Sequence, residues 1–283
     1  METTQKNAAP KAATPNKKAA ESKGFTGIKS AGIVILCCFV IAVLFYVFWL
    51  GNPVHFVNGD LNNHPSDMWG TVYKGGPVVP CIHTLLLTVI SLSIERYFAI
   101  KNAHGKGKMV TFVKSIKAAL AKGDIAGAEA LADKQRGSVA NVVKATLLKY
   151  KEMEENKTLP KAQKLIAIQK ELEEATALEM PMMQENLPIL ATITTLGTLF
   201  GLLGTVIGMI RSFAALASGG SADSMALSQG ISEALINTAF GILTGALAVI
   251  SYNFFTNKID KLTYSLDEVG FTIVQTFAAH HAE

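Results

Sequence analysis

The chain has 283 residues, of which 49% are hydrophobic, and its formal net charge is +4. A mean hydropathy of +0.31 is high for a soluble enzyme, so membrane segments must be considered first. Lysines beside membrane segments, where anionic lipid headgroups attract them, explain the small basic excess, and nucleic-acid binding is not needed to explain it.

A bilayer core requires a helix of about 20 apolar residues. Four windows approach or exceed this length without an internal charge: Ala31 to Leu50, Pro77 to Ile94, Leu187 to Ile210 and Ala234 to Asn257. The apolar run of the first window is too long for a cleaved signal peptide, and no small-residue cleavage site follows it. We therefore expect a retained anchor.

Basic residues are frequent before the first window and between the second and third, whereas residues 51–76 contain only Lys74 and residues 214–229 contain none. The positive-inside rule places both termini in the cytoplasm. The predicted fold is an all-α integral membrane protein whose long transmembrane helices extend into a cytoplasmic helical bundle. In chain order we expect a disordered cytoplasmic tail (1–30), an extra transmembrane helix (31–50), a periplasmic loop (51–76), a transmembrane helix (77–100), a cytoplasmic helical region (101–186), a transmembrane helix (187–217), a short periplasmic turn (218–229), a transmembrane helix (230–257) and a cytoplasmic C-terminal helix (258–283).

Some polar residues have simple interpretations. His55 and His64 in the external loop are compatible with metal binding or pH sensing, but an ordinary surface position suffices, and His83 is interpreted as a core histidine. Glu95 and Arg96 are expected to snorkel to the cytoplasmic headgroups. The spans contain no Ser/His pair, paired aspartates or HExxH motif, so we expect no enzyme, cofactor or metal site.

The helix predicted around residues 160–180 and the third window together predict one long rod, interrupted or bent near Pro181 and Pro188.

The third window carries a stripe of small and polar residues. Its members lie within about 40° of one helical direction, with Gly208 flanking them: Thr194, Thr198, Gly201, Thr205 and Ser212. In one interpretation the glycines allow close helix packing while the threonines bond to their own carbonyls. In the other, the hydroxyls line an ion pathway.

The fourth window favours the pathway, because Glu233 borders it and an intramembrane carboxylate is a functional-site hypothesis by default. In an antiparallel hairpin, equal sums of residue numbers indicate equal depth. Thr205 is therefore level with Thr238, and Arg211 is level with Glu233, about 8 to 9 Å nearer the outside. An ion pair between Arg211 and Glu233 is one possibility.

Two sequence blocks resemble the ExbB/TolQ family of proton-channel subunits. The segment Gly201-Leu-Leu-Gly-Thr205-Val-Ile-Gly-Met-Ile-Arg-Ser-Phe213 is similar to the second core helix of the family, and Ile231-Ser-Glu233-Ala-Leu-Ile-Asn-Thr238-Ala-Phe-Gly241 is similar to the third. The likeness is greatest to ExbB. The extra span at residues 31–50 is absent from the shorter family members. The resemblance assigns no role to Arg211.

The resemblance implies a homopentamer around an ExbD/TolR-like single-span partner with a membrane aspartate. It implies that Thr205 and Thr238 border this aspartate and that Glu233 belongs to the proton pathway. By helical spacing, Gly241 and Gly245 flank the Thr238 face of the fourth window and belong to the pore-lining or packing stripe. An ExbB-like protein would use the proton motive force at the inner membrane of a Gram-negative bacterium to energise a TonB-like protein. TolQ-like envelope maintenance, a MotA-like motility stator and a non-conducting membrane scaffold are the alternatives.

Overall fold

The computed structural model describes residues 30–61, 63–219 and 224–280, and the elements named within them are all helical. Within these residues the extended backbone pairs only at an isolated bridge between Phe56 and Pro65. Four helices are long and apolar enough to cross a membrane. The predicted all-α membrane fold is therefore confirmed. The tail expected before Ser30 and the last three residues lie outside the described part of the chain.

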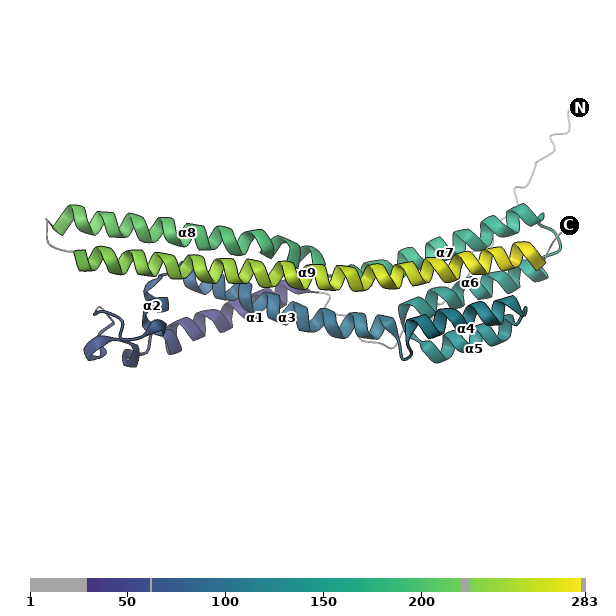
Figure 1. Ribbon diagram of the computed structural model, residues 1–283, viewed down its shortest axis with the longest axis horizontal. Coiled ribbons are helices and arrows are strands. Elements are labelled where there is room, and N and C mark those ends of the chain that lie inside the picture. The colour runs from purple at the N-terminus through teal and green to yellow at the C-terminus, as the bar shows by residue number, and fades with distance from the viewer. Residues whose placement is uncertain (1–29, 62, 220–223, 281–283) are drawn as a thin grey trace, which may run out of the picture.

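The N-terminal half contains the first two candidate spans and the segment between them. Its helices are α1 (Ala31–Leu44), the π-helical turn η1 (Phe45–Leu50), the short 3₁₀ turns η2 (Pro53–His55) and η3 (Val57–Gly59), α2 (Met68–Lys74) and α3 (Val78–His104). Helix α1 packs along α3 (Figure 1). The segment expected to be an irregular loop thus contains one α-helix. Asp67 is the N-cap residue of this helix, and its side chain accepts a hydrogen bond from the Gly70 amide at 2.8 Å.

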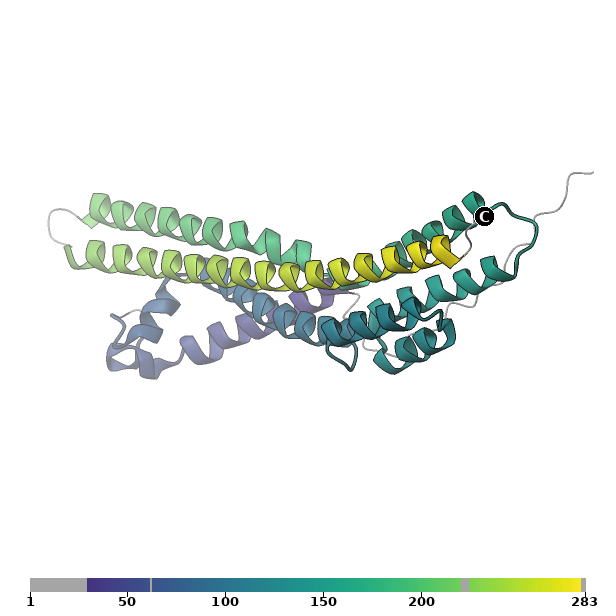
Figure 2. The ribbon, with the colours of Figure 1, turned by 45° about the vertical axis from the view of Figure 1, so that its right-hand side comes forward.

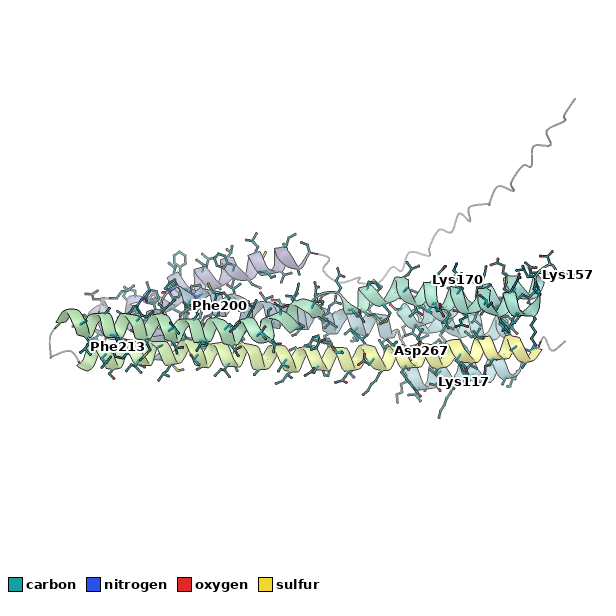
Figure 3. All side chains as sticks on the ribbon, turned by 90° about the horizontal axis from the view of Figure 1, so that it is seen from above. Lys117, Lys157, Lys170, Phe200, Phe213 and Asp267 are labelled. Atoms are coloured by element: carbon teal, nitrogen blue, oxygen red, sulfur yellow. The ribbon has the colours of Figure 1, made fainter. Side chains whose placement is uncertain are left out.

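The hairpin and the bundle share one helix. Helix α8 (Leu187–Gly219) lies beside the first half of α9 (Ser224–His280), and the second half of α9 continues among the bundle helices in both views (Figures 1 and 2). The bundle helices are α4 (Met109–Ala121), α5 (Ile125–Gln135), α6 (Gly137–Glu155) and α7 (Lys161–Gln184). The labelled charged side chains Lys117, Lys157, Lys170 and Asp267 lie on the bundle, and Phe200 and Phe213 lie on the hairpin (Figure 3).

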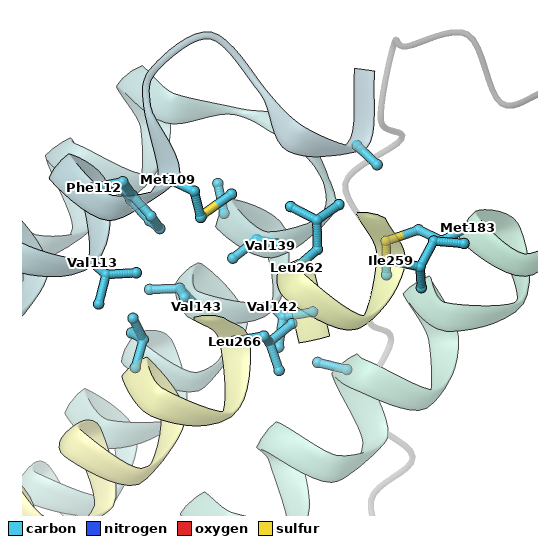
Figure 4. Close-up of a cluster of buried hydrophobic side chains, with 14 of the residues drawn as sticks. Met109, Phe112, Val113, Val139, Val142, Val143, Met183, Ile259, Leu262 and Leu266 are labelled. Carbon is cyan, nitrogen blue, oxygen red and sulfur yellow. The ribbon is translucent and has the colours of Figure 1, made fainter. Parts of the chain in front are cut away.

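The membrane segment expected at 230–257 and the C-terminal segment expected at 258–283 form one continuous helix, in agreement with the prediction that transmembrane helices extend into the bundle. The reason is that its buried face does not stop at the boundary: Phe255, Ile259, Leu262 and Leu266 are all at most 5% exposed. Leu262 and Leu266 pack among side chains of α4 and α6 (Figure 4). The turn expected at 218–229 is also shorter, because α9 is already helical at Ser224.

The rod formed by α7 and α8 is broken between the two prolines. Pro181 stays inside α7 and Pro188 lies in the first turn of α8, where a missing N–H is tolerated. The break falls at Asn186, whose φ of 64° is incompatible with a continuing right-handed helix.

The expectation that Glu95 and Arg96 snorkel to the headgroups is wrong. Arg96 is 0% exposed and Glu95 is 4% exposed. Arg96 donates from Nη1 to the carbonyl oxygens of Met182 and Met183 at 3.2 and 3.3 Å, near the end of α7. Because the last carbonyls of a helix have no partner within it, the break requires a buried donor, and Arg96 is that donor.

Candidate functional site

Glycines bring α8 and α9 into direct backbone contact. A Cβ atom placed on Gly241 would lie 2.6 Å from both the carbonyl oxygen of Gly197 and the Cα of Gly201. A Cβ on Gly245 would lie 2.8 Å from the carbonyl oxygen of Thr194. Small residues at such crossings allow membrane helices to approach closely. The close-packing interpretation of the stripe therefore describes its glycines correctly.

Several hydroxyl groups of the stripe bond to their own helix. Thr194 donates to the carbonyl of Leu190 at 3.2 Å, Thr198 to that of Thr195 at 2.8 Å, and Ser212 to that of Gly208 at 2.9 Å. Back-bonding satisfies a hydroxyl without a partner helix. These three residues consequently need no polar pathway to explain them.

Thr205 and Thr238 differ, because they meet across the helix pair. The hydroxyl of Thr238 donates to the carbonyl of Gly201 at 3.1 Å, and its oxygen lies 3.5 Å from that of Thr205, while the Thr205 hydroxyl donates to the carbonyl of Leu202 at 2.7 Å. The equal depth predicted for the two threonines is confirmed. Both side chains are partly buried. Each hydroxyl oxygen can also accept a hydrogen bond from a third group.

Glu233 and Arg211 lie near a residue of the first span. Both interact electrostatically with the phenol of Tyr46, which belongs to η1. Glu233 is partly buried and Arg211 is exposed. The predicted ion pair between them stays a prediction, but both residues share the neighbourhood of Tyr46, so a cation, a carboxylate and a phenol lie in one region of the hairpin.

Asn237 shares the helix face of Glu233, as helical spacing predicts, but it was not among the predicted site residues. It is 2% exposed and donates from Nδ2 to the carbonyl of Gly75 at 3.0 Å. Its position one helical turn from Glu233 could have indicated this role, because a buried amide in a membrane helix requires a hydrogen-bond partner. The partner is 162 residues away along the chain, which no periodicity reveals.

The histidines find ordinary partners. His83 lies with Nδ1 2.9 Å from the carbonyl of Val79, and its ring stands between those of Phe45 and Phe240, in agreement with a core histidine. His55 lies with Nδ1 2.6 Å from Asp67. No group of three or more residues able to hold a metal ion occurs among the described residues.

A row of apolar side chains on the other side of α8 is exposed, which leaves it available for lipid or for further chains. Its members include Leu199, Leu202, Val206, Ile210 and Phe213, each at least 49% exposed. A single chain thus buries one face of its hairpin and leaves the opposite face uncovered.

Fold and site together define an α-helical membrane protein with a glycine-packed polar hairpin. Residues 139–268, which run from α6 through the hairpin into the bundle part of α9, match the MotA/TolQ/ExbB proton channel family. This match agrees with the resemblance to ExbB and TolQ that the two sequence blocks indicated.

Individual relatives are also similar to only part of the chain. The chain is 36% identical over 86 residues to "Putative biopolymer transport protein ExbB-like 3" of Synechocystis, covering 30% of this chain and 41% of that protein. It is 39% identical over 88 residues to "Tol-Pal system protein TolQ" of Pseudomonas aeruginosa, covering 31% and 38%, and 36% identical over 81 residues to "Biopolymer transport protein ExbB" of Salmonella typhimurium, covering 29% and 33%. The chain therefore spans about two fifths or less of the length of these relatives.

Proposed function

We propose that this protein is the channel subunit of a proton-driven motor in the inner membrane, most similar in role to ExbB. The observation that carries the proposal is the meeting of Thr205 and Thr238 at one depth of a glycine-packed hairpin. Their hydroxyl groups can hydrogen-bond a carboxyl group or water, but they do not exchange a proton with solvent at ordinary pH. The titrating carboxylate at this depth is therefore assigned to another chain.

The partner proposed is an ExbD/TolR-like protein with one span and a membrane aspartate. Several copies of the present chain, five by analogy with ExbB, would surround it and would use their exposed apolar rows to meet one another and the lipid. Glu233, in the outer half of the hairpin, would belong to the route by which protons reach the aspartate. Both termini would lie in the cytoplasm of a Gram-negative bacterium, and a TonB-like protein would receive the mechanical output.

The experiment is a proton-flux assay on the complex in proteoliposomes that contain a pH-sensitive dye. The full chain is co-expressed with the ExbD/TolR-like protein of the same organism and purified as a complex. Thr205→Val and Thr238→Val preserve side-chain shape but remove the hydroxyl, and we expect each to lower the flux by about tenfold or more. The complex should still assemble.

Thr192→Val is the matched control, because Thr192 lies on the same helix, is exposed and donates only within it, to the carbonyl of Pro188 at 2.8 Å. We expect it to leave flux unchanged. If Thr205→Val and Thr238→Val conduct as well as Thr192→Val does, the hydroxyl groups only pack helices. The close glycine contacts would then favour the alternative function, a non-conducting membrane scaffold.

A second question is which process the motor energises. The likeness to TolQ is as high as the likeness to ExbB, so envelope maintenance is a specific alternative to TonB-dependent transport. Co-purification separates the two, because an ExbB-like complex should bind a TonB-like protein and a TolQ-like complex should bind a TolA-like one. A MotA-like role in motility predicts neither.

A further inference from the structure

The turn that joins α2 to α3 receives side chains from both helices of the hairpin. Gly75 accepts a hydrogen bond from Asn237 of α9, and a Cβ atom placed on Gly76 would lie 2.8 Å from Nη1 of Arg211 of α8. The turn belongs to the part of the chain outside the family match, whereas Arg211 and Asn237 belong to the matched part. This contact therefore connects the N-terminal segment with the shared core.

Asn237 occupies a point where three elements meet. Its Cβ faces Gly204 of α8, on which an added Cβ would lie only 2.5 Å away, and its amide faces Gly75, on which an added Cβ would lie 2.8 Å from Oδ1. The carbonyl of Gly75 stands at the end of α2, and the last carbonyls of a helix have no partner within it. Asn237 supplies a donor there, so one hydrogen bond satisfies both the Gly75 carbonyl and Nδ2 of the buried Asn237 side chain.

The first span adds a third polar contact to the same region. The ring of Tyr46 stacks on that of Tyr73 with centroids 4.7 Å apart, and its hydroxyl donates to the carbonyl of Tyr73 at 3.0 Å. This phenol is the group that interacts electrostatically with both Arg211 and Glu233. Leu50, Val72 and Val79, each at most 2% exposed, form an apolar cluster against which Ile236 and Phe240 of α9 pack.

We propose that Asn237 and Arg211 clamp the Gly75–Gly76 turn, so that the N-terminal unit, residues 31–76, fixes Arg211 as a positioning residue for Glu233. The unit is thus more than a membrane anchor, because it is the part that holds the outer polar layer in place. A guanidinium that rests against the turn cannot swing freely toward or away from the carboxylate. The role given to Glu233 rests on the proposed function, whereas the clamp itself does not.

Two measurements keep the clamp and the proton pathway separate. The first is a spin-label distance between cysteines placed at Met68 of α2 and Ile210 of α8, which are 67% and 63% exposed, in a full chain whose Cys37, Cys38 and Cys81 are replaced by serine. The second is the proton flux of the reconstituted complex.

For the clamp, we expect Asn237→Leu, which cannot donate, to broaden the distance distribution. Gly75→Ala is the second variant, because its Cβ would lie 2.7 Å from Val79 Cγ2 and 2.8 Å from Asn237 Oδ1, so that both side chains must move, while a φ of −57° at this position suits alanine. The controls are Asn253→Leu, at an exposed position of the same helix, and Gly32→Ala, where an added Cβ meets nothing within 4 Å. Distributions as narrow in both test variants as in the controls would overturn the clamp.

For the positioning role, we expect Arg211→Gln to lower the flux by about tenfold and Arg211→Lys to restore most of it, since the cation rather than the fork geometry is needed. Equal flux in Arg211→Gln and the unsubstituted complex would overturn the role of Arg211. The unsubstituted complex could also show no flux while its distance distribution is narrow and is broadened by Asn237→Leu. This result would overturn the proposed function and support the clamp.

Discussion

Glu95 and Arg96 are neighbours in sequence and form a buried ion pair joined by two hydrogen bonds. Arg96 donates from Nε to one carboxylate oxygen at 2.6 Å and from Nη2 to the other at 2.5 Å, and Asn186 donates to the first of these oxygens at 3.3 Å. The same guanidinium holds the end of α7 through Met182 and Met183. Charge pairing and the helix break therefore depend on one side chain.

Replacing Arg96 alone should destabilise the protein strongly. Arg96→Met leaves the Glu95 carboxylate buried without its cation and removes the donor from two carbonyls, for which we expect a loss of about 3–5 kcal/mol in unfolding free energy. Thermal or denaturant unfolding in detergent measures it. The double variant Glu95→Met/Arg96→Met should lose clearly less, because no charge then stays buried. Equal losses of unfolding free energy in the single and double variants would show that the buried charge of Glu95 does not cause the destabilisation.

The glycine contacts of the hairpin predict a large effect from one methyl group. Gly241→Ala should lower stability by about 1–3 kcal/mol, because its Cβ would collide with backbone atoms of α8, which cannot move aside as a flexible side chain can. Gly32→Ala, at an open position of α1, should change stability little. A loss in Gly241→Ala no greater than in Gly32→Ala would mean that the two helices separate readily.

The segment that contains α2 should loosen in acid. A hydrogen bond from the Gly70 amide, with help from His55, holds the pKa of the Asp67 carboxyl below its usual value. A depressed pKa stabilises the fold above the unfolded value, near pH 4, and this contribution is lost as the pH falls through the lower folded value. The protection factor of the Gly70 amide against hydrogen exchange, which corrects for the slower intrinsic exchange in acid, should therefore fall below about pH 4.

Asp67→Asn provides the control for the acid effect, because asparagine also caps helices but does not titrate. In this variant the protection factor of the Gly70 amide should no longer depend on acid. The same acid dependence in the variant as in the parent chain would assign the loosening to another group.

The bundle part of α9 should be as important to stability as the membrane part. Phe277 is 0% exposed and meets the ring of Tyr150 edge to face, with centroids 4.9 Å apart. Phe277→Ala should cost about 3–5 kcal/mol, measured by unfolding. Phe271→Ala is the matched control, because Phe271 lies on the same helix and is 63% exposed. Similar losses for the two variants would contradict the assigned core.

The sequence predicted the four spans and the level pairing of Thr205 with Thr238, because both follow from apolar length and helical rise along neighbouring segments. It did not predict the burial of Arg96. The carbonyls that this residue binds lie 86 and 87 positions away, and they need a donor only because Asn186 breaks the helix. The place of Asn237 was hidden for the same reason, since its partner at Gly75 belongs to a turn formed by distant elements.

The uninterrupted course of α9 has a mechanical consequence. From Thr238 in the membrane hairpin to Phe277 in the bundle is about 58 Å at 1.5 Å per residue, and the helix runs this distance as one element. Its companion on the hairpin side does not, since the break at Asn186 separates α8 from α7. A force applied to α9 at the level of Thr238 therefore has an unbroken helical path to Leu262 and Phe277 in the bundle.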